Sequence, residues 1–174
     1  QRLDQIPDEV FELEHLERLD LGGNQLTAVP EAIGRLRNLT TLSLSNNSIA
    51  VLAEALLRLE HLRRLYLSSN RLAALPEWLP GLASLAELNI SDNPLAALPG
   101  WLGHMQTLTR LEMAGPAGYE LEEVPGWLAE LRGQVYLNLG GHRLANLPGW
   151  LAELRNLVSL DLGRHRLADL PGWI

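Results

Sequence analysis

The sequence contains no cysteine and no lysine, so all fourteen of its basic residues are arginine. Without cysteine the chain has no disulfide, no thiolate nucleophile and no thiolate zinc ligand. We attach no function to the arginine bias. Any catalytic or metal site would have to be built from other side chains.

Long apolar runs and an excess of positive charge are also lacking. No stretch of eighteen apolar residues and no recognisable signal peptide occurs, so no membrane insertion is predicted. The net charge is −7 and the pI is about 5.2. An acidic chain of this kind argues against a nucleic-acid partner or an anionic membrane surface.

Catalytic motifs are absent as well. The sequence has no GxSxG elbow, no Walker loop and no HExxH or other paired metal motif. His15, His61 and His104 fall at different places along the chain and do not assemble a site with a nucleophile. We therefore expect that the chain is not an enzyme: it should have no catalytic residue and bind no metal and no cofactor.

What the sequence does have is a repeat, LxxLxLxxNxLxxLPxxLxxLxx, seen most clearly over residues 62–84. Copies begin at residues 16, 39, 62, 85, 108, 134 and 157, and residues 1–15 fit the second half of an earlier copy. The interval is 23 residues, except for 26 between 108 and 134. A fixed period in this range predicts a solenoid, here one elongated domain over residues 1–174. Both ends fall inside a repeat without a polar cap, so we expect a fragment of a longer protein.

This pattern resembles the leucine-rich repeat family in its 23-residue intracellular form, and the resemblance covers essentially the whole chain. It implies an α/β solenoid, a right-handed superhelix with a parallel β-sheet on its concave side. It also implies binding of a protein partner. Many extracellular members carry disulfide-bonded caps, so the missing cysteine favours a reducing compartment or a bacterial source. The expected location is the cytoplasm, or a host cell for a bacterial effector.

The LxL segment of each repeat alternates apolar and polar residues, as a half-buried strand does. In residues 64–68, Leu65 and Leu67 should point into the core, and Arg64, Tyr66 and Ser68 toward the concave surface. The second half of the repeat contains proline, which favours extended or helix-initiating conformations. We expect short 3₁₀ pieces or irregular turns on the convex side.

The turn after each strand carries an asparagine in the early repeats: Asn24, Asn47, Asn70 and Asn93. Its amide offers both donors and an acceptor to backbone groups stranded inside the turn. His142 and His165 hold this position in the last two repeats. We expect each imidazole to replace the amide; a zinc site, the alternative, would need more ligands. Protonation would remove the acceptor and should weaken these repeats first.

Two further features admit a structural and a functional interpretation. The longer repeat contains AGPAGYELEEVP, either a neutral bulge or a contact loop presenting Pro116 and Tyr119. A tryptophan follows the proline by two residues from the third full repeat onward, at positions 78, 101, 127, 150 and 173. These rings are either a stacked packing spine or a partly exposed strip for assembly.

The outward strand positions carry the candidate binding residues. The first column is Arg18, Thr41, Arg64, Glu87, Arg110, Tyr136 and Ser159; the second is Asp20, Ser43, Tyr66, Asn89, Glu112, Asn138 and Asp161; the third holds only small residues. Tyrosine and arginine are enriched at binding hot spots. The predicted partner-binding residues are Arg64, Tyr66, Arg71, Glu87, Asn89, Asp92, Arg110, Glu112, Tyr136 and Asn138. The alternative is a solvated face whose row Arg64–Glu87–Arg110 pairs across strands without a ligand.

The function expected from this pattern is a non-catalytic module that binds a protein on its concave sheet. Two alternatives stay open: the recruiting domain of a larger enzyme, such as an effector ubiquitin ligase or a Roco-type GTPase, and a self-assembling structural solenoid. The chain departs from the family pattern at Ala53, which replaces proline, at Gln134, which replaces the leading leucine, and in the 26-residue repeat. The oligomeric state is not predicted.

Overall fold

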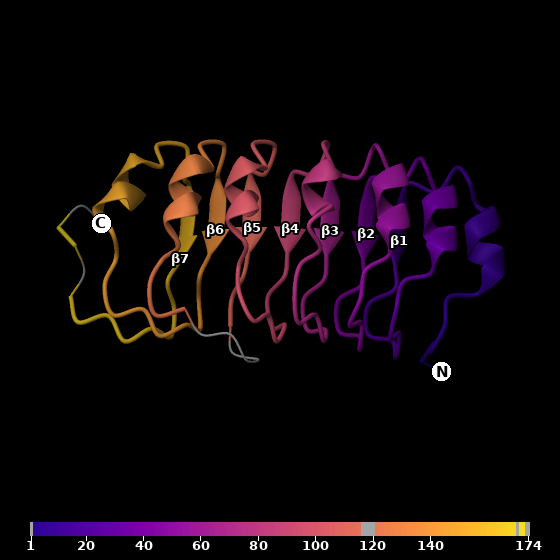
Figure 1. Cartoon of the computed structure of the whole chain (residues 1–174), viewed down its shortest axis with the longest axis horizontal. Helices are drawn as coiled ribbons and strands as arrows, with labels where there is room; N and C mark the ends of the chain where they lie inside the picture. Colours follow the sequence, from indigo (N-terminus) through magenta and orange to yellow (C-terminus); the bar gives the residue numbers. More distant parts are fainter. Residues whose placement is uncertain (1, 116–120, 170, 173–174) are drawn as a thin grey trace.

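The LxL segment of each repeat forms a three-residue strand in the computed structural model, which describes residues 2–115, 121–169 and 171–172. The strands are β1 Arg18–Asp20, β2 Thr41–Ser43, β3 Arg64–Tyr66, β4 Glu87–Asn89, β5 Arg110–Glu112, β6 Tyr136–Asn138 and β7 Ser159–Asp161. They form one parallel sheet in the order of the sequence (Figure 1). Equivalent residues pair throughout, Leu65 with Leu88 for example.

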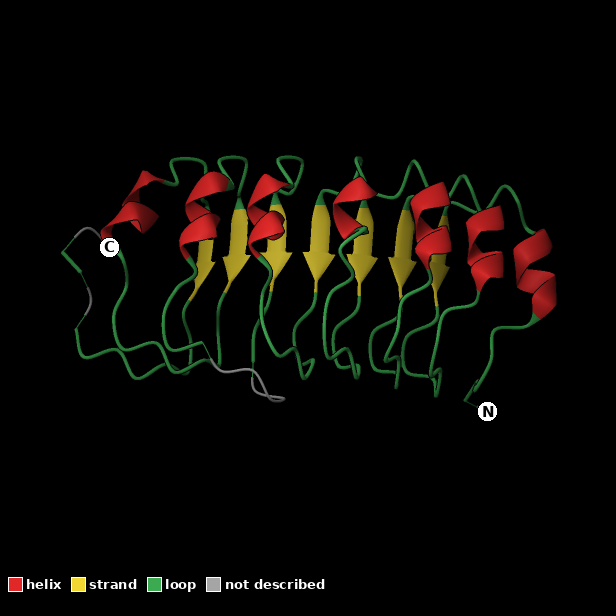
Figure 2. Cartoon of the chain, viewed as in Figure 1, coloured by secondary structure: helices red, strands yellow, loops and turns green. Residues whose placement is uncertain are grey.

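The second half of each repeat forms a short 3₁₀ helix. The helices are η1 Asp8–Glu12, η2 Glu31–Arg35, η3 Glu54–Arg58, η4 Leu79–Gly81, η5 Gly100–His104, η6 Gly126–Glu130 and η7 Gly149–Glu153. They lie on the face opposite the strands, and their row spreads wider than the row of strands (Figure 2). The solenoid therefore curves with the sheet on its inner, concave side. The predicted fold is confirmed.

Proline sets the start of most of these helices. Pro30, Pro99 and Pro148 stand at the position before the helix with extended ψ angles of 155°, 142° and 144°. Ala53 adopts the same conformation, with ψ of 136°, and η3 follows it normally. The missing proline at this position therefore leaves the helix unchanged. η4 is the shorter exception, because it begins only after Trp78 and includes Pro80.

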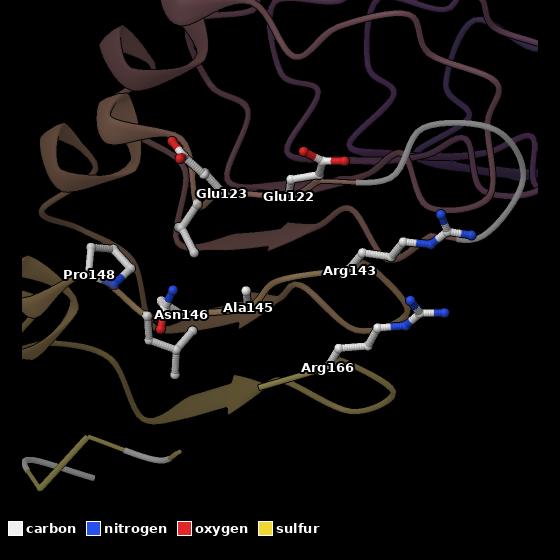
Figure 3. A pocket seen from close by; sticks show the side chains of 9 residues that line it. Glu122, Glu123, Arg143, Ala145, Asn146, Pro148 and Arg166 are labelled. Carbon is white, nitrogen blue, oxygen red and sulfur yellow. The ribbon is translucent and has the colours of Figure 1, made fainter. Parts of the chain in front are cut away.

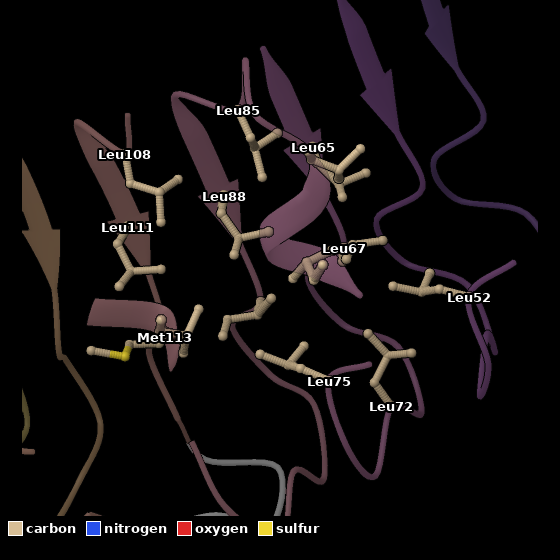
Figure 4. Close-up of a cluster of buried hydrophobic side chains, with 14 of the residues drawn as sticks. Leu52, Leu65, Leu67, Leu72, Leu75, Leu85, Leu88, Leu108, Leu111 and Met113 are labelled. Atoms are coloured by element: carbon tan, nitrogen blue, oxygen red, sulfur yellow. The ribbon is translucent and has the colours of Figure 1, made fainter. Parts of the chain in front are cut away.

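The core is a continuous column of leucines shared by neighbouring coils (Figure 4). Leu65, Leu67 and Leu88 are buried, as the alternation in the strand segments predicts. Gln134 is also buried, at 1% exposure, in place of a leucine. Its amide can donate to the carbonyl oxygen of Leu108 and accept from the amide nitrogen of Leu111, both at 3.1 Å. A polar side chain is tolerated there because both ends of its amide are satisfied.

The 26-residue interval does not disturb the sheet. Arg110 still pairs with Tyr136, and Leu111 with Leu137. The extra residues fall after β5. Residues 116–120 of that segment, which include Pro116 and Tyr119, lie outside the described residues. Close packing of the coils resumes at Gly141, which has φ of +79° and where a Cβ would collide with the carbonyl oxygen of Gly115.

Candidate functional site

The concave face is formed by the first and third residues of each strand. On β2 to β6 these side chains are half-buried, while the middle leucine of each strand is buried. The richest part lies over β3 to β6 and is here named the polar cluster. Its members are Arg64, Tyr66, Glu87, Asn89, Arg110, Glu112 and Tyr136.

Glu87 is the centre of one half of the polar cluster. Its two carboxylate oxygens accept hydrogen bonds from Arg64 Nε at 2.9 Å and from the Tyr66 hydroxyl at 2.8 Å. Burial alone would raise the pKa of Glu87, but these two bonds and the positive charges of Arg64 and Arg110 outweigh it and hold the pKa below its ordinary value. Burial and the same bond raise the pKa of the Tyr66 hydroxyl. The carboxylate is therefore kept ionised and fixed in place.

Glu112 is the centre of the other half. One oxygen accepts from Arg110 Nε at 2.7 Å and the other from Asn89 Nδ2 at 3.0 Å. The Arg110 guanidinium also lies over the ring of Tyr136, with Cζ 3.7 Å from the ring centroid, a cation–π geometry. Three neighbouring strands therefore hold one ion pair and one aromatic ring in a fixed arrangement.

The alternating row Arg64–Glu87–Arg110 forms only in part. Arg64 pairs with Glu87 across the strands, but Arg110 turns to Glu112 on its own strand. The reason is that Glu87 already accepts at both oxygens, whereas Glu112 stands two residues from Arg110 on the same face. The row is thus divided into two ion pairs, although the charges of Glu87 and Arg110 still act on each other.

The remaining predicted residues lie around the cluster. Arg71 is exposed on the turn after β3, and Asp92 holds a left-handed backbone with φ of +54° at the corresponding turn after β4. Asn138 Oδ1 accepts from the backbone nitrogen of Gly140 at 2.8 Å. Asp92 and Asn138 line a hollow together with small residues and one further charge of each sign, namely Ala114, Gly115, Gly140, Gly141, Gly163, Asp161 and Arg164. The third column therefore leaves the lower part of the face open.

The asparagines bond adjacent coils as their chemistry predicts. Asn70 Oδ1 accepts from Ile49 N at 2.9 Å, and its Nδ2 donates to Leu44 O at 2.9 Å and Leu67 O at 3.0 Å. Two of these three bonds cross to the preceding coil. Asn47 and Asn93 make the same set one coil earlier and one coil later.

The two histidines at this position differ from each other. His142, 3% exposed, places Nε2 2.6 Å from the carbonyl oxygen of Met113 and Nδ1 3.3 Å from the backbone nitrogen of Leu121. It reproduces both cross-coil bonds of an asparagine. His165 instead bonds the carbonyl oxygen of His142 through Nδ1 at 3.0 Å, and its buried Nε2 has no partner in the described part of the chain. The two rings stack with centroids 6.3 Å apart.

Two other surfaces are less organised. Trp78, Trp101, Trp127 and Trp150 are half-buried against the core, and among the described residues none of these rings stacks on another; Trp173 lies outside the described residues. A hollow near the C-terminal coils has Glu122 and Glu123 on one side, with Arg143 and Arg166 projecting side by side from adjacent coils (Figure 3).

Within residues 2–115, 121–169 and 171–172, no group of three or more histidine, aspartate or glutamate side chains could hold a metal ion. No helix in those ranges is long and apolar enough to cross a bilayer.

Comparison with known proteins places this geometry in context. The family profile described as "Leucine rich repeat" matches residues 1–49, 37–95 and 60–115. No curated protein matches the chain by sequence. A leucine-rich repeat protein of Leptospira interrogans has a similar structure, with a TM-score of 0.82 and 27% identity over 99% of this chain and 49% of that one.

A second similar structure comes from a plant. It is the leucine-rich repeat ectodomain of the Arabidopsis thaliana membrane receptor kinase GASSHO1/SCHENGEN3, in complex with CASPARIAN STRIP INTEGRITY FACTOR 2. The TM-score is 0.77 and the identity 31%, over 93% of this chain and 20% of the ectodomain. The chain thus spans about half the length of the bacterial protein and a fifth of the plant one.

Proposed function

The chain belongs to the leucine-rich repeat family, and on that basis we propose that it binds a protein partner through the concave face of its sheet. Leucine-rich repeat domains are common protein-interaction modules. The observation that carries the proposal for this face is the polar cluster, because it presents two arginines and two tyrosines in one patch. These side chain types dominate binding hot spots.

The cluster is also pre-organised. Arg64, Tyr66 and Arg110 are each held by a carboxylate, so they lose little side-chain freedom when a partner docks. They stay accessible: the side chains of Arg64 and Arg110 are 42% and 39% exposed. A solvated face with no ligand would also pair its charges, and it is the alternative that the capture experiment tests.

Recruitment within a larger protein is the second candidate. The chain is similar to a fifth of an ectodomain that belongs to a receptor kinase and carries a bound partner. In a longer protein, the same face would bring a partner or substrate to an attached enzyme. The residues that make contact would be the same in both cases.

Affinity capture with mass spectrometry tests the site. Lysate of the source organism or its host is passed over the wild-type chain, a face variant (Arg64→Glu, Tyr66→Ala, Arg110→Glu) and a charge-matched control (Arg37→Glu, Arg155→Glu). Arg37 and Arg155 are exposed on the turns after η2 and η7, away from the cluster. All three proteins are first shown by circular dichroism to have matched thermal stability.

The proposal expects a protein that the wild type and the control retain and the face variant loses. Retention of the same proteins by all three would place the binding surface elsewhere. Light scattering of the wild type over a range of concentrations separates self-assembly from binding of another protein.

A further inference from the structure

In the polar cluster, the carboxylate oxygens are already hydrogen-bonded, whereas the arginines keep unused donors. All four carboxylate oxygens of Glu87 and Glu112 already accept a hydrogen bond from a neighbouring side chain. Both arginines make those bonds through Nε, and in the described chain neither uses its terminal Nη atoms in a hydrogen bond. The guanidinium fork is the part of arginine that matches a carboxylate. Within the polar cluster, the donors left for a partner are therefore the terminal Nη groups of Arg64 and Arg110.

These donors lie in a regular row. Arg18, Arg64 and Arg110 occupy the first position of β1, β3 and β5, and are here named the cationic row. The in-register pairing places each arginine two strands from the next. With strands about 4.8 Å apart, successive arginines are anchored about 9.6 Å apart. Curvature toward this face brings their tips slightly closer together.

The negative charges of the face lie outside the row or are used within it. Glu87 stands in the row but is bonded on both oxygens. Asp20, Glu112 and Asp161 lie one row further along the strands. Glu112 is paired with Arg110, and Asp20 and Asp161 accept from the backbone nitrogens of Gly22 and Gly163. An anionic ligand that follows the first positions of the strands meets arginine at every second strand.

One peptide conformation matches this spacing. A polyproline II segment has three residues per turn and rises about 3.1 Å per residue, so every third side chain lies on one side, about 9.3 Å from the next. A β-strand presents alternate residues about 6.7 Å apart, which does not match the spacing of about 9.6 Å between successive arginines of the cationic row. We propose that the concave face recognises an extended, polyproline II segment of a partner protein with a carboxylate at every third residue, seated on Arg18, Arg64 and Arg110.

This inference rests on the proposed function and names the chemistry of its partner. Four synthetic proline-rich peptides of equal length test it by fluorescence anisotropy with the full chain at low ionic strength. One carries three glutamates at every third residue, and one carries three glutamates at every second residue. The others carry three glutamines or three lysines at the every-third positions.

We expect the every-third glutamate peptide to bind tightest and to be released at about 1 M salt, where the screening length falls to about 3 Å. Arg64→Gln and Arg110→Gln should each weaken it about threefold to tenfold, as expected for a partly exposed ion pair. Arg18→Gln should do the same. Arg18 makes no side-chain hydrogen bond in the described chain, so this variant cannot act by disturbing the cluster. Arg37→Gln is the control and should bind like the wild type.

Several results would overturn the inference. They are equal binding of the lysine or glutamine peptide, equal binding of both glutamate spacings, indifference to the three substitutions, or no binding at millimolar peptide. The capture experiment reads the proposed function separately. A protein lost only with the face variant, while the peptides fail, would remove the acidic ligand and leave the binding face.

Discussion

Arg110 lies over the ring of Tyr136, 3.7 Å from its centroid, although 26 residues separate them in the sequence. The contact depends on the register between β5 and β6, which pairs these two residues directly across the interval that contains three additional residues. The additional length is absorbed after β5 and the concave face stays continuous. The C-terminal coils therefore contribute to the same concave face as the central ones.

Removing the Tyr136 ring should destabilise the chain more than removing its hydroxyl. Tyr136→Ala loses the cation–π contact with Arg110, which is expected to cost about 0.5–1 kcal/mol in addition to the lost packing, whereas Tyr136→Phe keeps a ring beneath the guanidinium. Urea denaturation measures both. Equal losses for the two variants would show that the hydroxyl, and not the ring, carries the contact.

Glu87 should contribute stability that depends on pH. Its pKa lies below the ordinary value, so the folded state holds the ionised form more tightly than the unfolded state does. The contribution is complete above the unfolded pKa, about 4.3, and is lost as the pH falls through the lower folded value. At neutral pH, the free energy of unfolding of the wild type should exceed that of Glu87→Gln by about 0.5–1 kcal/mol.

The measurement is urea denaturation of both proteins from neutral pH to about pH 3, the region below the ordinary carboxyl pKa. The difference between them should shrink across the acidic part of that range. A difference that stays constant with pH would mean that Glu87→Gln acts through lost packing or hydrogen bonding and not through the lost charge. Asp20→Asn, a change to an exposed carboxylate of the same face, is the matched control.

Asn70 should be among the most costly polar positions to truncate. It is 6% exposed, and its amide satisfies three backbone groups on two coils. Asn70→Ala leaves those groups buried and unpaired, which we expect to cost about 2–4 kcal/mol. Asn24→Ala, at a half-exposed site near the chain start, should cost clearly less. Similar losses in chemical denaturation would contradict the role of burial.

The sequence predicts the repeating parts well because each repeat imposes the same environment. Leu65 must be buried and Asn70 must bridge coils wherever the pattern recurs, so one copy explains all. The pattern does not decide contacts between unlike residues. Whether Arg110 pairs with Glu87 or Glu112 depends on which oxygens are already taken, and that is settled only by side-chain positions.

The two histidines show the same limit. An imidazole carries its nitrogens at fixed positions on a rigid ring, so it can replace an amide only where a donor and an acceptor happen to match. Met113 and Leu121 provide that match for His142. His165 bonds a different carbonyl and leaves Nε2 without a partner in the described chain. The equal spacing in the sequence therefore predicts the hydrogen bonds of His142 correctly but not those of His165.

The hydrogen bonds of His142 fix its tautomer and give the last prediction. A carbonyl oxygen can only accept, so Nε2 carries the proton toward Met113 and Nδ1 accepts from the Leu121 nitrogen. Protonation at Nδ1 would set two donors against each other inside the coil. Acidification should therefore open the coils around β6 and β7 before those around β2 and β3.

Hydrogen exchange at several pH values, corrected for the intrinsic exchange rate, measures this order of opening. Amides of β6 and β7 should lose protection on acidification while those of β2 and β3 keep it. His142→Asn restores an amide that can donate to Met113 and accept from Leu121 but cannot titrate, so it should abolish the selective loss. His165→Asn is the control, because His165 does not accept from the preceding coil and its removal should leave the selectivity in place. Unchanged protection of the wild-type β6 and β7 in acid would show that the neutral imidazole is not what holds these coils together.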